Sequence, residues 1–349
     1  MPNARLEALV YGAALALIIG WVLYVGRGVF VPVVLGVLVV YVIVGLTRLL
    51  GKLPYLGRAM PAKLSYALSI LLICAGFAFG GYLLVANIDT VLARGPMYQE
   101  SLLASIQTVA VFLGFETEPT WISLRQDLLA QINVQRVIGS TVVSVTSILA
   151  SFVVVFLYTS FLLLELRYFP AKLAGLSSDP QRVARIRKVT SDINARIGSY
   201  LALKTFVSVL LGAISWVIMT LYGLEFATFW AVLIALLNFV PYIGSFLGVL
   251  FPVAMAVVQF GDINTVVMLL IYLSAAQFVI GNFLDPYVMG NSLNLSPFAI
   301  LVSLTVWSGL WGISGAFLAV PITAILTIVF SEFRGTRPIA VLLSRDGRL

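Results

Sequence analysis

The first long apolar run of the chain, LEALVYGAALALIIGWVLYVG at residues 6–26, decides the class of fold. A helix crosses the hydrocarbon core of a bilayer with about 20 mostly apolar residues. This run reaches that length and carries one charged side chain, Glu7. The apolar core of a secretory signal peptide is shorter, about 7–15 residues, and a cleavage site of small residues follows it. The run therefore predicts a retained first membrane span.

Apolar runs of this kind recur through the whole chain of 349 residues. The sequence is 61% hydrophobic and only 10% charged, with a mean hydropathy of +1.08, whereas soluble domains carry about 25% charged residues. This composition is typical of a polytopic membrane protein. We predict an all-α fold with about eight membrane segments. The further runs are 29–50, 63–88, 140–165, 198–222, 226–240, 243–260, 263–284, 298–311 and 312–331.

Four of these runs are short and form two pairs. The first pair is broken at NFVPYIG, residues 238–244, and the second at SGLWGISG, residues 308–315, with Pro321 close behind. Each member extends about 21–30 Å as a helix, which is short to marginal for a span. Paired short segments interrupted by glycine and proline are typical of transport sites. We predict two broken hairpins that cross twice or re-enter from one side, and ordinary spans joined by tight turns are the alternative.

Basic residues gather in short segments between the apolar runs. The segment 48–63 holds four basic residues and no acid, and 167–196 holds seven basic residues against two aspartates. By contrast, 89–139 holds five acids and three arginines. The positive-inside rule places the first two segments in the cytoplasm and the third outside, with both termini cytoplasmic. We expect the net charge of +7 to orient the chain in a bilayer and not to bind nucleic acid.

These features divide the chain into five parts. In the external segment Leu102, Ile106 and Leu113 recur at helical spacing, which predicts amphipathic helices that lie on the membrane or pack against a neighbouring subunit. The predicted parts are 1–88 (N-terminal scaffold spans), 89–139 (external helical insert), 140–197 (fourth span and basic cytoplasmic segment), 198–331 (candidate transport core) and 332–349 (cytoplasmic tail).

Residue content excludes several classes of chemistry. The chain has no histidine, which removes the Ser–His protease arrangement. Its single cysteine, Cys74, allows no intrachain disulfide and no cysteine metal cluster. The nearest approach to a nucleotide-binding P-loop, GLTRLLGKL at 45–53, has the wrong spacing and a leucine in place of the Ser or Thr that binds Mg²⁺. We therefore expect no enzyme activity, no cofactor and no metal site.

The stretch QFVIGNFLDPYVMGNSLNLSP, residues 277–297, places an acid between apolar runs. No Lys or Arg occurs between Thr205 and Phe333, so the sequence offers Asp285 no basic neighbour. A charge at membrane depth costs about 2.5–3.5 kcal/mol on insertion scales, and without a basic partner it must bind a proton or cation or stay hydrated. Pro286 disfavours the α conformation at Asp285 and frees backbone carbonyls there. We interpret Asp285 as a candidate cation-coupling residue, with capping of the next segment as the alternative.

Uncharged polar side chains accompany this acid. Asn238, Gln277 and Asn282 offer donors and acceptors that suit a small polyhydroxylated or carbonyl solute, although intramembrane amides also bond neighbouring helices. Lys204 is expected to extend to the cytoplasmic interface, with a cavity as the alternative. The predicted solute path comprises Asn238, Pro241, Tyr242, Gly244, Gln277, Asn282, Asp285, Pro286, Gly290, Gly312, Gly315 and Pro321.

Three C-terminal motifs carry a family resemblance. NFVPYIGSFLGVLFP (238–252), QFVIGNFLDPYVMGNSLNLSP (277–297) and LWGISGAFLAVPITAIL (310–326) closely resemble motifs of the autoinducer-2 exporter (AI-2E) family. The SYLALK entry to the 198–222 span and the order of spans, basic loop and polar insert are similar too. The resemblance implies export or antiport across the bacterial inner membrane, by members that form homo-oligomers.

The leading hypothesis is a secondary transporter that exports a small polar solute similar to the quorum-sensing signal autoinducer-2. A proton or sodium gradient drives movement through Asp285, with passive, facilitated flow as the alternative. A monovalent cation/proton antiporter is the first alternative, supported by the acidic half that lacks bases. A membrane scaffold that recruits partners through its basic segment 167–196 is the second alternative. The partners expected are the solute, H⁺ or Na⁺, and the lipid bilayer.

Overall fold

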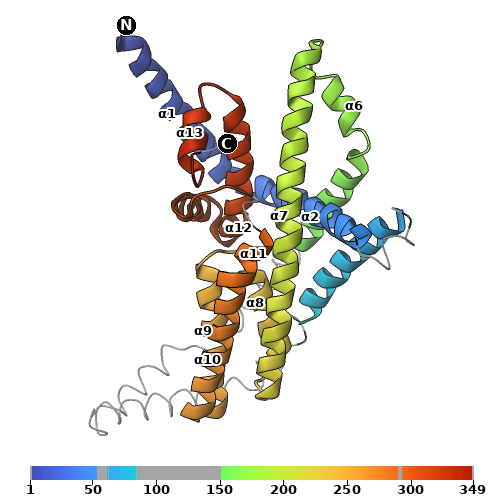
Figure 1. Cartoon of the computed structure of the whole chain (residues 1–349), viewed down its shortest axis with the longest axis vertical. Coiled ribbons are helices and arrows are strands. Elements are labelled where there is room, and N and C mark those ends of the chain that lie inside the picture. The colour runs from blue at the N-terminus through green and yellow to red at the C-terminus, as the bar shows by residue number, and fades with distance from the viewer. Residues whose placement is uncertain are drawn as a thin grey trace. The chain divides into compact units, whose positions relative to one another are not determined.

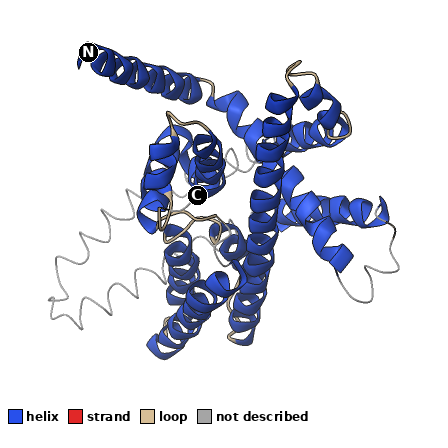
Figure 2. Ribbon diagram, turned by 45° about the horizontal axis from the view of Figure 1, so that its top comes forward, coloured by secondary structure: helices blue, strands red, loops and turns tan. Residues whose placement is uncertain are grey.

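The computed structural model describes residues 2–52, 61, 63–83, 86, 151–289 and 293–347. Within these ranges every regular element is a helix, and the prediction of an all-α fold is confirmed (Figures 1 and 2). The predicted external insert, 89–139, and Gly290 lie outside the described residues. The labelled elements are α1 (Pro2–Val25), α2 (Arg27–Lys52), α6 (Phe169–Ala174), α7 (Pro180–Leu221), α8 (Ala227–Leu237), α9 (Ile243–Phe260), α10 (Ile263–Val279), the π-helical turn η1 (Ile280–Leu284), α11 (Asp285–Met289), α12 (Pro297–Glu332) and α13 (Arg337–Leu343).

Six of the described helical segments are long and apolar enough to cross a membrane. They are Arg27–Arg48, Lys63–Leu83, Pro180–Leu221, Ile243–Phe260, Ile263–Met289 and Pro297–Glu332. Val10–Val25, Ser151–Glu165 and Ala227–Leu237 are shorter apolar helices. Together they make the chain a polytopic membrane protein, as the composition predicts.

The described residues form two compact units. One contains parts of 1–69, 153–202 and 291–349, and the other contains parts of 70–152 and 203–290. In the second unit the C-terminal part of α7 packs with α8, α9 and α10 around a continuous apolar core (Figure 1). Its fully buried side chains include Leu211, Ile234 and Leu269, one each from α7, α8 and α10.

The first predicted hairpin consists of α8, the turn 238–242, and α9. Its α8 has 11 residues, about 16 Å of helix, which is too short to cross the hydrocarbon core on its own. The turn is tight because Gly244 lies directly against the end of α8. A Cβ at Gly244 would lie 1.8 Å from the carbonyl oxygen of Leu237, so no other residue fits without moving one of the two helices.

The second predicted hairpin is the two halves of α12, which meet at Gly312 with φ 63° and ψ −140°. This backbone conformation is outside the range of L side chains and suits glycine alone. Three residues later, Gly315 lies against the first half of α12 as closely as Gly244 lies against α8. A Cβ at Gly315 would lie 1.8 Å from the carbonyl oxygen of Trp307. Across the two halves, Trp307 Nε1 donates to Thr323 Oγ1 at 3.3 Å. Both interruptions therefore lie where the sequence predicts them.

One predicted interruption is wrong. The sequence predicts irregular backbone at Asp285 and Pro286, but the chain stays helical from Ile263 to Met289, and Asp285 has φ −55° and ψ −54°. The reason is the π-helical turn η1, in which Asp285 N donates to the carbonyl oxygen of Ile280, five residues back. A turn with i→i+5 bonds is wider than an α-turn, and it accommodates a proline that has no N–H to give and whose ring would otherwise crowd the preceding turn.

Candidate functional site

The π-helical turn sets the direction of the Asp285 side chain. Buried residues of α10 form one stripe that ends at Gln277, and positions seven apart lie on nearly the same side of an α-helix. The position seven residues after Gln277 is Leu284, which an unbroken α-helix would turn toward the core. The turn η1 inserts one extra residue, so Asp285 also turns toward the interior, next to Leu284, which still packs against the apolar core. The turn therefore points a carboxylate toward the packed interior of the second unit.

In the interior of the second unit, Asp285 forms an ion pair with a lysine. Lys204 Nζ on α7 lies 2.7 Å from Asp285 Oδ2, and the two side chains are 9% and 19% exposed. The expectation that Asp285 lacks a basic partner is wrong, and so is the expectation that Lys204 extends to the membrane surface. The lysine lies just before the base-free stretch in the sequence, and the fold brings it to the acid across 81 residues.

Two buried polar atoms of the helical stretch 263–289 have no partner among the described residues. They are Asp285 Oδ1 and Gln277 Nε2. The Gln277 amide lies against Gly248 of α9, where an added Cβ would be 2.9 Å from Nε2. Glycine at that position gives the amide its room. An unpaired buried polar atom costs about 1–3 kcal/mol, so an acceptor and a donor are both available here to a bound ligand.

A second polar contact lies one helical turn further along α7. Ser208 follows Lys204 by four residues, hence on the same face, and its Oγ accepts a hydrogen bond of 3.0 Å from Asn238 Nδ2. Asn238 is the first residue after α8, at the break of the first hairpin. Both side chains are buried. The face of α7 that bears Lys204 and Ser208 thus contacts both the hairpin break and the π-helical turn.

Not all residues of the predicted path join this site. Asn282 is exposed and its amide donates to the carbonyl oxygen of Phe278 in the same helix, so it makes a local contact only. Tyr242 is 56% exposed and adopts φ 62° at the tight turn, next to Pro241. The remaining predicted positions of α12, namely Gly312, Gly315 and Pro321, belong to the other unit.

The sequence of the chain matches a known protein family. The family model described as AI-2E family transporter matches residues 13–335. The chain belongs to the AI-2E family. The AI-2 transport protein TqsA of Escherichia coli (strain K12) is 30% identical over 254 residues, which cover 71% of each chain. The putative transport protein YhhT of the same strain is 27% identical over 345 residues, covering 97% of this chain and 86% of YhhT.

Another relative resembles the chain more closely but over a shorter stretch. A putative transport protein of Borreliella burgdorferi is 38% identical over 195 residues, which cover 56% of this chain and 54% of the relative. Since the family match extends over nearly the whole chain and the helices suit a bilayer, this AI-2E protein is a membrane protein with a transport role.

Proposed function

We propose that this chain is a secondary transporter that exports a small polar solute of the AI-2 type across the bacterial inner membrane. Both termini face the cytoplasm, and the solute path lies in 198–331. The name of the relative TqsA supports the solute class, and the absence of a P-loop from the sequence supports a gradient as the source of energy. An assembly of several copies is part of the proposal.

The observation that carries the proposal is the buried pair of Lys204 and Asp285. Desolvating two charges costs about as much as their attraction returns, and apolar residues of similar volume often serve packing as well or better. A chain that needed only to hold α7 against α10 and α11 would therefore gain little from this pair. In contrast, a carboxylate that exchanges a lysine for a proton or cation needs both the lysine and a free oxygen. Asp285 Oδ1 is unpaired among the described residues.

The pair suggests how coupling works. With Lys204 bound, Asp285 is compensated and the unit is closed. A proton or Na⁺ that reaches Asp285 removes the attraction for the ammonium, which is then left buried and uncompensated, and this favours a rearrangement of α7 relative to the π-helical turn. The solute would use neutral groups of the same helical stretch, with its hydroxyl or carbonyl oxygens accepting from Gln277 Nε2.

Reconstitution tests this function. We expect the purified chain in proteoliposomes to accumulate an AI-2-type solute when a proton or sodium gradient is imposed, and we expect Asp285→Asn to abolish that accumulation. The matched control is Asp262→Asn, since Asp262 lies outside the candidate spans and an asparagine still caps α10. Accumulation at the wild-type rate by Asp285→Asn would remove Asp285 from the mechanism.

A cation/proton antiporter is the second candidate, because the free oxygen of Asp285 suits a small cation as well as a hydroxyl. Pulses of Na⁺ and Li⁺ separate the two functions. An antiporter changes the pH inside the vesicles with no solute present, whereas a solute exporter does so only when its solute moves.

A further inference from the structure

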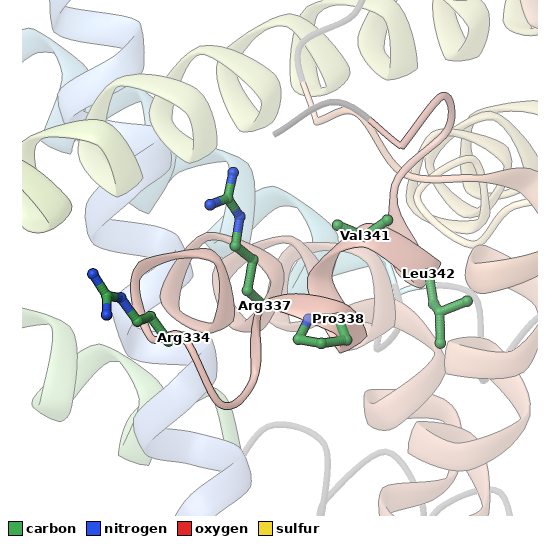
Figure 3. A pocket seen from close by; sticks show the side chains of 5 residues that line it. All are labelled: Arg334, Arg337, Pro338, Val341 and Leu342. Atoms are coloured by element: carbon green, nitrogen blue, oxygen red, sulfur yellow. The ribbon is translucent and has the colours of Figure 1, made fainter.

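The segment that follows α12 carries a groove of about 520 Å³, lined by Arg334, Arg337, Pro338, Val341 and Leu342 (Figure 3). This volume is within the range of small-molecule sites, about 300–1,000 Å³. The candidate span α12 ends at Glu332, so the groove begins within two residues of a membrane span. We therefore expect a ligand bound there to lie at the level of the lipid headgroups.

One end of the groove is cationic. Figure 3 shows the guanidinium groups of Arg334 and Arg337 at the same end, away from Val341 and Leu342. Both arginines are exposed, and neither side chain has an ion pair or hydrogen bond within the part of the chain that the structure describes. Elsewhere Arg182 pairs with Asp179 at 3.4 Å. Two arginines three residues apart in the chain, neither with an ion pair among the described residues, provide donors that suit a phosphate.

The other end of the groove is apolar. Pro338, Val341 and Leu342 continue the lining from the arginines along α13 (Figure 3), and Leu342 is 80% exposed. An apolar surface of this kind is favourable only when something apolar covers it. Since the groove adjoins a membrane span, the hydrocarbon available to cover it is a lipid acyl chain.

The groove is also held in shape. Although α13 has only 7 residues, the backbone on its C-terminal side is tied to the segment before α12. Ser296 N donates to the carbonyl oxygen of Leu343 at 2.9 Å, and Arg345 N donates to that of Asn294 at 3.2 Å. Ala340, on the inner side of α13, is fully buried. The backbone of α13 therefore has a fixed position relative to the start of α12, whereas the exposed arginine side chains become ordered when a ligand binds.

We propose that this groove binds one anionic phospholipid, with its phosphate between Arg334 and Arg337 and an acyl chain over Pro338, Val341 and Leu342. Inorganic phosphate would satisfy only the first half of the site. Phosphatidylcholine carries the same phosphate and acyl chains, but its choline cation offsets the attraction of the phosphate for the two arginines. The groove lies outside the proposed solute path, 198–331, and backbone hydrogen bonds join the C-terminal end of α13 to the segment before α12.

The test uses the full-length protein in a nonionic detergent. Dioctanoyl phosphatidylglycerol is titrated in, and the bound lipid is counted by native mass spectrometry, with dioctanoyl phosphatidylcholine and inorganic phosphate as separate arms. Each basic residue near a lipid headgroup contributes about fivefold in affinity. We therefore expect the double variant Arg334→Gln/Arg337→Gln to lose one phosphatidylglycerol site, with about 25-fold weaker binding. Phosphatidylcholine should bind weakly to the wild type, and no better or worse to the variant.

Two controls keep the result specific. Arg345→Gln removes an exposed arginine of the same segment that does not line the groove, and it should change the affinity less than twofold. Leu342→Asn should weaken both lipids to a similar extent. The proposal is overturned if the double variant binds phosphatidylglycerol as the wild type does. It is also overturned if inorganic phosphate binds the wild type as tightly as phosphatidylglycerol does, or if the wild type binds no lipid because a second copy or another protein covers the groove.

Discussion

The buried pair of Lys204 and Asp285 predicts a distinctive pattern in a double-mutant cycle. Removing one partner leaves the other charge buried and uncompensated, at a cost of about 3–5 kcal/mol. Because Asp285 is 19% exposed and Lys204 only 9%, Lys204→Met should cost about 3 kcal/mol and Asp285→Leu about 4 kcal/mol. Replacing both with apolar residues leaves no uncompensated charge, so the double variant should be close to the wild type.

Thermal unfolding of the purified protein in detergent measures this pattern. For chains of this length 1 kcal/mol shifts Tm by about 2 °C, so the single variants should unfold about 6–8 °C below the wild type. The double variant should unfold within about 2 °C of it. Lys172→Met is the matched control, because Lys172 pairs with Glu165 in an exposed ion pair that contributes at most about 1 kcal/mol. If the two single effects simply add in the double variant, the two side chains are not a buried pair and the proposed coupling fails with them.

Three further predictions concern the turns and the cap. Gly315→Ala should lower Tm by several degrees, because its Cβ would lie 1.8 Å from the Trp307 carbonyl oxygen. Gly281→Ala is the control and should leave Tm unchanged, because the space around its Cβ is open. Equal losses of Tm in the two variants would refute the tight turn. Deleting Gly281 should remove the extra residue of the π-helical turn, rotate Asp285 by about 100° and abolish gradient-driven uptake, and unchanged uptake would show that the turn does not orient the carboxylate. Hydrogen bonds from the next helical turn lower the pKa of Asp262, so its charge stabilises the fold at neutral pH and this contribution is lost as pH falls through that lowered pKa. Thermal unfolding of Asp262→Ala should therefore show a deficit at pH 7 that persists at about pH 5 and shrinks only in stronger acid, and a deficit that disappears above pH 5 would contradict this.

The two hairpins were predictable because their determinants are local. A turn tight enough to bring Gly244 against Leu237 or Gly315 against Trp307 admits only glycine, and a short apolar run on each side of it leaves few other folds. The helical class is also predictable from composition, because the backbone groups of an apolar segment in hydrocarbon must form their hydrogen bonds within that segment.

The site was predictable only in part because its determinants are long-range. Asp285, Gln277 and Asn238 stand out as polar residues in apolar surroundings, and the fold buries Gln277 and Asn238. The partner of Asp285 does not stand out, because Lys204 lies 81 residues away near the end of a basic segment, where a lysine usually extends to the surface. The π-helical turn cannot be recognised from the pattern of hydrophobic residues. Because of this turn, the backbone before Pro286 stays helical, whereas the sequence predicts irregular backbone there.

The central claim is that the solute path and the coupling group are separate functions of one site, with Asp285 responsible for coupling. Solute counterflow in proteoliposomes tests it most directly, because exchange of labelled for unlabelled solute needs the path but no gradient. We expect Asp285→Asn to keep counterflow near the wild-type rate and to lose gradient-driven accumulation. If Asp285→Asn loses neither activity, or loses counterflow and accumulation to the same extent while remaining folded, Asp285 is not a coupling group that acts separately from the solute path.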